Sequence, residues 1–295
     1  MRDTPGARLN LSSVTYVPWV RKGHVRKGGR TASRRMPKRP RFIRACRPQR
    51  AVLVGVVDRT GHADAADVRA VFEDVERRLA VHDLRVAWPV DVEIVSMPIM
   101  GATKSTKGHH TLFASLDAVR SNAFDGLLAH EMGHMIRTEV RHPSHDPAVY
   151  KAIGKEVRVP RAGLQALGEA FNHVQDIYAD DLAFLSGFDG RAHEFFRVWI
   201  EGNSGRRARD RWANVSRSVT NGFALGNLRR HGLVQADDPL WTRAREFDRR
   251  AGFEALDGFA DLFAALPEDP SPKTVVERVK SLASSMVRAA DSRSF

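Results

Sequence analysis

Apolar and polar residues follow a strand period in several short segments of the first half of the chain. A β-branched run at residues 52–57 ends in a turn and predicts a buried strand. A second strand is expected at 90–97, before Pro98 breaks the pattern. The polar stretch 104–108 is expected to be a loop, and a third strand is expected at 111–116. Together these segments predict a small sheet.

Helical periodicity dominates the rest of the sequence. Apolar residues recur at steps of three and four after Asp64, a candidate N-cap, as far as about Val81. Ser121 is expected to cap the next helix, and a loop is expected at 142–147. A long amphipathic helix is predicted at 164–185, ending before Gly187. Further helices are expected near 191–201, 206–230, 239–251 and 272–290.

The helix expected after Ser121 carries the sequence His130-Glu131-Met132-Gly133-His134. Residues four apart on a helix lie about 6 Å along its axis and on the same face, so the two imidazoles can share one ion. Glu131 lies between them and is placed to reach a metal-bound water. This pattern predicts a zinc site with Glu131 as the catalytic general base.

A zinc site of this kind needs a third protein ligand. The helix at 164–185 offers a polar stripe on one face, and its opposite face is apolar and suited to packing on the core. Asp176 is the first candidate, with Glu169 and His173 as alternatives. The members of the stripe are Glu169, Asn172, His173, Asp176 and Asp180.

The two segments His130–His134 and Asp176–Asp180 together resemble the gluzincin metallopeptidases, especially the M48-like group. In that group a downstream helix carries Glu-x-x-Ala-Asp. The resemblance covers about 110–188 and implies Asp176 as the third zinc ligand and Asp180 as the partner of a ligand histidine. Asn172, one turn before Asp176, is similar to the pattern of uncharacterised prokaryotic zincin-like families. The chain departs from gluzincins in offering Asp for Glu, which requires the two helices to lie closer together.

In zincins the strand before the site helix binds an extended peptide along its edge, and Thr111–Leu116 is expected in that position. His109 and His110 precede it and are candidates to line the cleft. A donor to the transition state is also expected. Tyr178, Tyr150 and His173 are the candidates for that role.

Charge is distributed unevenly along the chain, which has a net charge of +12. Residues 1–50 hold fifteen basic residues and one acidic residue, so the remainder is nearly neutral. This composition predicts a disordered basic tail, either a solvated extension or a segment with weak nucleic-acid contact. Met36 is an alternative start that would shorten it.

The composition of the chain excludes several other classes of protein. The single cysteine, Cys46, excludes an intrachain disulfide framework and a site built of several thiolates. Charges interrupt every apolar run before the roughly 18–20 residues that a membrane span requires. No signal peptide is evident, so a cytoplasmic location is expected.

Two other functions are compatible with parts of the sequence. His145-Asp146 suggests a metal-dependent phosphohydrolase, although that pair lies in a predicted loop rather than on a helix. A non-catalytic zincin-like module bound to nucleic acid through residues 1–50 is the alternative to an enzyme.

The sequence therefore predicts an α+β, zincin-like protein with a small mixed sheet packed on the site helix and a mostly helical C-terminal half. The expected divisions are a tail (1–50), a metal-binding catalytic domain (51–188) and a helical region packed on it (189–295). The expected function is a metallopeptidase holding one Zn²⁺ per chain and cleaving a peptide or protein substrate.

Overall fold

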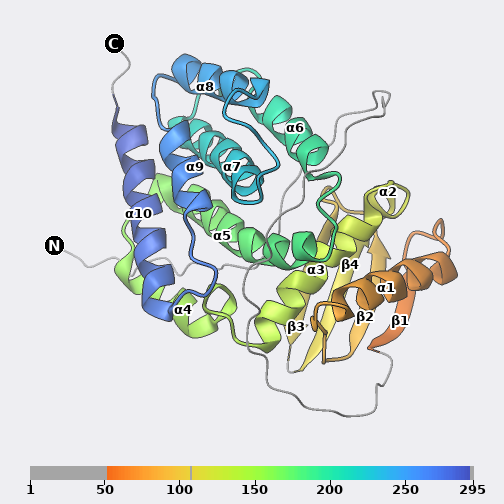
Figure 1. Cartoon of the computed structure of the whole chain (residues 1–295). Helices are drawn as coiled ribbons and strands as arrows, with labels where there is room; N and C mark the ends of the chain where they lie inside the picture. The colour runs from red at the N-terminus through yellow and green to blue at the C-terminus, as the bar shows by residue number, and fades with distance from the viewer. Residues whose placement is uncertain (1–51, 107, 293–295) are drawn as a thin grey trace.

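The computed structural model describes residues 52–106 and 108–292 (Figure 1). It is an α+β fold in which a small mixed sheet is followed by a mostly helical C-terminal half, as the sequence predicts. The expected tail at 1–50 lies outside the described residues. The strands are β1 (Leu53–Asp58), β2 (Val90–Val95), β3 (Gly101–Thr106) and β4 (His109–Ser115). The α-helices are α1 (Ala65–Ala80), α2 (Leu116–Val119), α3 (Phe124–Glu139), α4 (Pro147–Glu156), α5 (Leu164–Leu185), α6 (Ala192–Asn203), α7 (Arg211–Arg230), α8 (Pro239–Ala251), α9 (Leu256–Ala264) and α10 (Pro272–Asp291).

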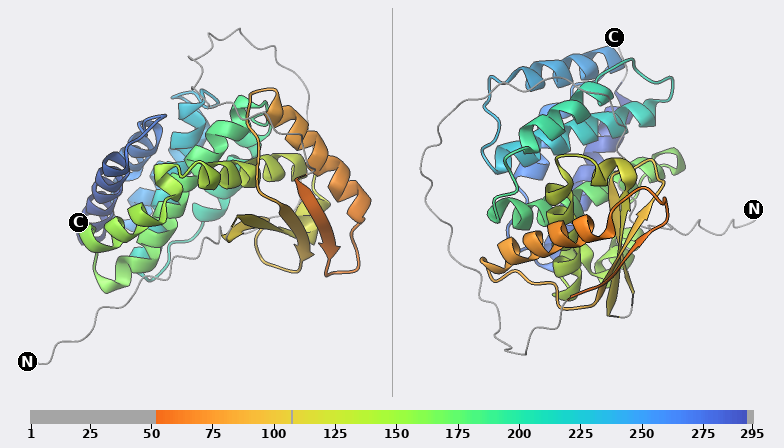
Figure 2. Two further views of the ribbon diagram at one scale, coloured as in Figure 1. Left: turned by 90° about the horizontal axis from the view of Figure 1, so that it is seen from below. Right: turned by 90° about the vertical axis from the view of Figure 1, so that its right-hand side faces the viewer.

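The sheet has the strand order β1-β2-β4-β3. β1 and β4 pair parallel to β2, whereas β3 pairs antiparallel to β4. Alternate residues of β2 are fully buried, because one face of the sheet packs on α1 and α3. Figure 2 shows both helices on that side.

Two expectations about strands β3 and β4 were wrong. Residues 104–108 were expected to be a loop, but Lys104–Thr106 belong to β3. The strand expected at 111–116 begins at His109 and is interior, so β3 and not β4 forms the free edge beside α3. The residues at the end of this edge strand are exposed and polar, which is why the pattern resembled a loop.

Three helix expectations also change. Ser121 does not cap α3, which begins at Phe124; Ser115 instead caps the short α2 through its bond to the Ala118 amide. The loop expected at 142–147 contains a 3₁₀ turn, Pro143–His145, and ends in Asp146, which caps the unexpected α4. α9 was also missed.

Most of the long helices agree closely with their periodicity, although α7, expected from about 206, begins at Arg211. α5 has the predicted bounds, and Asp64 caps α1 through the Ala66 amide. One apolar core lies between the sheet, α1 and α3, and a second lies among the helices from α4 onward. α5 contributes to both cores, so it joins the sheet to the helical half.

α3 and α5 lie in close backbone contact at Gly133. A Cβ on this residue would lie 2.7 Å from the carbonyl oxygen and 2.9 Å from the Cα of Ala179. Both atoms belong to backbone, which cannot move aside as a flexible side chain can. Glycine at 133 therefore sets the distance between the two helices.

Gly133→Ala is expected to lower the free energy of unfolding by about 1–3 kcal/mol, because the added methyl group forces α3 and α5 apart. Gly126→Ala on the same helix is the matched control, since a Cβ there meets nothing within 4 Å. That change should be neutral or stabilise by up to about 1 kcal/mol. Urea unfolding measures both, and equal stability of the two variants would contradict the close contact.

Candidate metal centre

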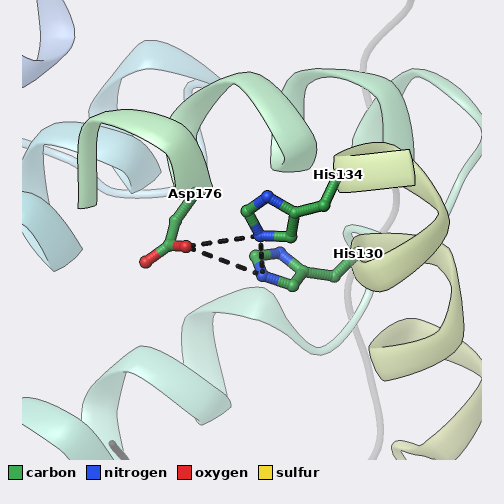
Figure 3. Close-up of side chains that lie close together, drawn as sticks. All are labelled: His130, His134 and Asp176. Carbon is green, nitrogen blue, oxygen red and sulfur yellow. Dashed lines mark hydrogen bonds and ion pairs between the residues drawn. The ribbon is translucent and has the colours of Figure 1, made fainter. Parts of the chain in front are cut away.

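Three side chains from two helices converge on one point (Figure 3). His130 and His134 project from one face of α3, and Asp176 reaches them from α5. One ligand atom from each of the three lies within 4.8 Å of the others. His134 Nε2 is 3.0 Å from His130 Nε2 and 3.4 Å from Asp176 Oδ1, and His130 Nε2 is 3.9 Å from the same oxygen.

These separations match the spacing that a tetrahedral zinc ion imposes on its ligands. Zinc binds imidazole nitrogen and carboxylate oxygen at ~2.0–2.2 Å, so two of its ligand atoms lie roughly 3.4 Å apart. The three measured distances bracket that value. The donor set, two imidazoles and one carboxylate, also suits zinc, and the residues present therefore fit one such ion.

The three side chains of the centre are not equally buried. The Asp176 side chain is 3% exposed, whereas those of His130 and His134 are 19% and 17% exposed. The two imidazoles are therefore partly exposed to solvent, whereas the carboxylate is shielded.

The electrostatics of the centre favour a cation. Burial lowers the pKa of His130, but the carboxylates of Asp180 and Asp176 outweigh burial and raise that pKa to about 10. Burial raises the pKa of Asp176, and the neighbouring imidazoles of His134, His173 and His130 outweigh burial and hold it well below its usual range. The carboxylates thus draw positive charge to this point.

Asp180 orients His130. Its Oδ1 lies 2.7 Å from His130 Nδ1, so the ring donates there and directs Nε2 toward Asp176. Asn227 of α7 donates to the other oxygen, Oδ2, at 2.6 Å. Asn227, in the helical half, thus holds Asp180 in place, and Asp180 orients His130. The sequence did not reveal the contact between Asn227 and Asp180.

His134 is oriented by a second chain of hydrogen bonds, which the sequence analysis missed. His134 Nδ1 lies 2.8 Å from His145 Nε2, and His145 Nδ1 lies 2.8 Å from the Ser144 hydroxyl. The hydroxyl in turn lies 2.8 Å from His142 Nδ1. The signal in the sequence was the His-Pro-Ser-His segment at 142–145, eight residues after His134.

The donors and acceptors in this series of hydrogen bonds follow from its last residue, His142. His142 Nδ1 accepts from the Ser144 amide at 3.3 Å, so it also accepts from the Ser144 hydroxyl. Burial lowers the pKa of His142 to about 3 and that of His145 well below its usual value, so each ring carries one proton. Ser144 therefore accepts from His145, His145 accepts from His134, and His134 Nε2 keeps its lone pair for a metal.

His173 supports Asp176. Its Nδ1 lies 3.2 Å from Asp176 Oδ2, and its Nε2 lies 3.0 Å from the Thr220 hydroxyl of α7. The ring stacks on Phe223 with centroids 4.3 Å apart. His173 is thus placed to orient the carboxylate from behind.

The remaining residues of the stripe lie elsewhere. Glu169 accepts from Gln165 and Ser216, and it is not part of the three-residue group. Asn172 is half-buried on α5, and its side chain makes no hydrogen bond to another described residue. Tyr178 is fully buried, and its hydroxyl donates to Pro267.

Tyr150, the third candidate donor, accepts from Gln175. His145 and Asp146, the pair that suggested a phosphohydrolase, bond to different parts of the structure. His145 bonds His134, and Asp146 caps α4.

Glu131 is buried between α3 and β3. Its Oε2 accepts from the Thr103 hydroxyl at 2.7 Å. A Cβ on Gly101 would lie 3.2 Å from Oε1, so glycine there leaves room for the carboxylate. His110, expected beside the cleft, is instead fully buried, and His109 pairs with Asp91 at 3.0 Å.

The fold and site define an α+β protein with a His-His-Asp group suited to one metal ion. Residues 74–287 match a family of unknown function, DUF5781, and the chain belongs to that family. The match runs through both the sheet and the helical half. Comparisons with curated proteins and with solved structures gave no match. Among the described helices, none is both long and apolar enough to cross a membrane.

Purified protein is expected to hold about one zinc ion per chain, and His134→Ala and Asp176→Ala should each lose it. Glu169→Gln is the matched control, because this acid lies on the same helix outside the group. Inductively coupled plasma mass spectrometry after dialysis measures the content. Zinc retained in Asp176→Ala but lost in Glu169→Gln would reassign the third ligand.

Proposed function

We propose that this protein is a zinc-dependent metallopeptidase of the zincin type, with His130, His134 and Asp176 as ligands. The observation that carries the proposal is the convergence of His130 Nε2, His134 Nε2 and Asp176 Oδ1 beside a buried glutamate. The resemblance of the two segments to M48-like gluzincins supports the same reaction. A bound zinc ion would act as a Lewis acid and lower the pKa of a coordinated water to about 7.

Glu131 is the proposed general base. It directly follows His130 in the sequence, and its Oε2 accepts a hydrogen bond from the Thr103 hydroxyl. Oε1 is then the oxygen that takes the proton from the attacking water and returns it to the leaving amine. Burial at 3% exposure keeps the carboxylate in one orientation for both transfers.

The edge of β3 is the proposed peptide-binding strand. Pairing along an antiparallel ladder alternates, and the amide of His110 donates to Pro89 on the β2 side. Leu112 lies two residues after His110, so its amide also points toward β2, and its partner Thr103 is in a non-hydrogen-bonded pair. The backbone N–H and C=O of Thr103 therefore face away from β4. An extended peptide added at this edge would run past the residue that holds Glu131.

The use of Asp in place of Glu at the third ligand is explained by Gly133. Asp is shorter than Glu by one methylene, so its helix must approach the histidine helix more closely. The contact of Gly133 with the backbone of Ala179, three residues after Asp176, supplies that approach.

Glu131→Gln is expected to keep its zinc and lower kcat by roughly 10²–10⁴-fold, because the amide cannot accept the proton of water. Cleavage of a mixed peptide library, followed by mass spectrometry, measures the loss. Glu73→Gln, an exposed acid on α1, is the control and should cleave like the wild type. A zinc-loaded wild type that cleaves no peptide would rule out the peptidase.

His145→Phe is expected to weaken zinc affinity by roughly 10–100-fold, since it removes the acceptor that holds His134 Nδ1–H. His145→Gln retains an acceptor oxygen and should remain within a few-fold of the wild type. Competition with a chromogenic chelator gives both constants, and circular dichroism checks the fold. Equal affinity in the Phe variant and the wild type would show that the chain does not orient the ligand.

A further inference from the structure

A cluster of Ser105, His110 and Glu139 lies at the hairpin end of β3 and β4. The Ser105 hydroxyl is 2.7 Å from His110 Nδ1, and His110 Nε2 is 3.0 Å from Glu139 Oε1. None of the three belongs to the metal-binding group. A hydroxyl, an imidazole and a carboxylate joined in this order are the components of an activated nucleophile.

The proton positions in this cluster follow from Glu139. Its oxygens accept from the amides of Ala87 and Trp88 at 2.8–2.9 Å, and these bonds fix the carboxylate. In the neutral ring, the carboxylate then accepts from His110 Nε2–H and the lone pair lies on Nδ1. The Ser105 hydroxyl then donates to that lone pair, which is the direction that general-base activation requires.

Burial separates the hydroxyl from the groups behind it. The His110 side chain is 0% exposed and that of Glu139 is 8% exposed, whereas Ser105 is an exposed residue. The His110 ring also stacks on Trp88, with centroids 5.0 Å apart. A reagent can therefore reach the oxygen of Ser105, while its base stays fixed and shielded from water.

The backbone supplies a donor beside the hydroxyl. Ser105 pairs with His110 across the ladder, and the His110 amide donates toward β2. The pair is thus of the non-hydrogen-bonded kind, so the Ser105 amide points outward from the edge strand. It lies next to its own Oγ, where the negative oxygen of a tetrahedral intermediate would form.

We propose that Ser105 is a nucleophile toward carboxylic esters, with His110 as its base, in a reaction that needs no metal. Ser105 Oγ bonds to the ester carbonyl carbon as its proton passes to His110 Nδ1. The C–O bond to the alcohol then breaks, and His110 protonates the departing alcohol. Water, deprotonated by His110, attacks the acyl–Ser105 ester, releases the acid and restores the hydroxyl.

A fluorophosphonate probe tests the nucleophile on the full chain. Ser105 Oγ should form a bond to phosphorus as fluoride leaves, and peptide mass spectrometry should place one adduct at Ser105. Ser105→Ala should give no adduct, and His110→Ala should label roughly 10²–10⁴-fold more slowly. Ser284→Ala, which removes an exposed hydroxyl bonded to a backbone carbonyl, should label like the wild type.

Two further measurements separate activation from a purely structural network. Protein treated with a zinc chelator should label at the untreated rate, so failure of the metal proposal leaves this test intact. Glu139→Gln keeps an acceptor for the Ala87 and Trp88 amides and should still fold, yet label more slowly than the wild type. Absence of an adduct on the wild-type chain, or an equal adduct on Ser105→Ala, would overturn the proposal.

Discussion

The metal centre depends on one packing constraint, the contact of α3 with the backbone of α5 at Gly133 and Ala179. Two histidines on one helix fix only two ligand atoms, and the third must come from a neighbouring helix at a set distance. Asp176 has a short side chain that cannot compensate for a wider separation. A side chain at 133 would move the whole α5 stripe, so the geometry of the site is determined by the absence of a Cβ at this position.

The helical half takes part in the site and does not merely pack beside it. Asn227 and Thr220, both on α7, bond Asp180 and His173, which in turn contact His130 and Asp176. The turn before α4 supplies His145 for His134. The ligands are thus held by residues of α5, which α7 supports, and by the turn before α4, and the family match across both halves is consistent with this arrangement.

Periodicity and spacing predicted the parts of the structure that depend on local sequence. The bounds of α5, the Asp64 cap and the convergence of His130 and His134 follow from helical geometry alone. β3 was missed because an exposed edge strand carries the polar residues of a loop. His145 and Asn227 could not be assigned because their roles depend on tertiary contacts, the latter 47 residues from its partner Asp180. The choice of Asp176 over Glu169 likewise needed the rotation of α5 about its axis.

Anomalous diffraction at the zinc absorption edge, from crystals of the full chain, tests the central claim most directly. We expect one anomalous peak bound by His130 Nε2, His134 Nε2 and one oxygen of Asp176 at ~2.0–2.2 Å, with the fourth position open to water. A peak at other side chains, or helices α3 and α5 that hold these atoms too far apart for a single ion, would contradict it.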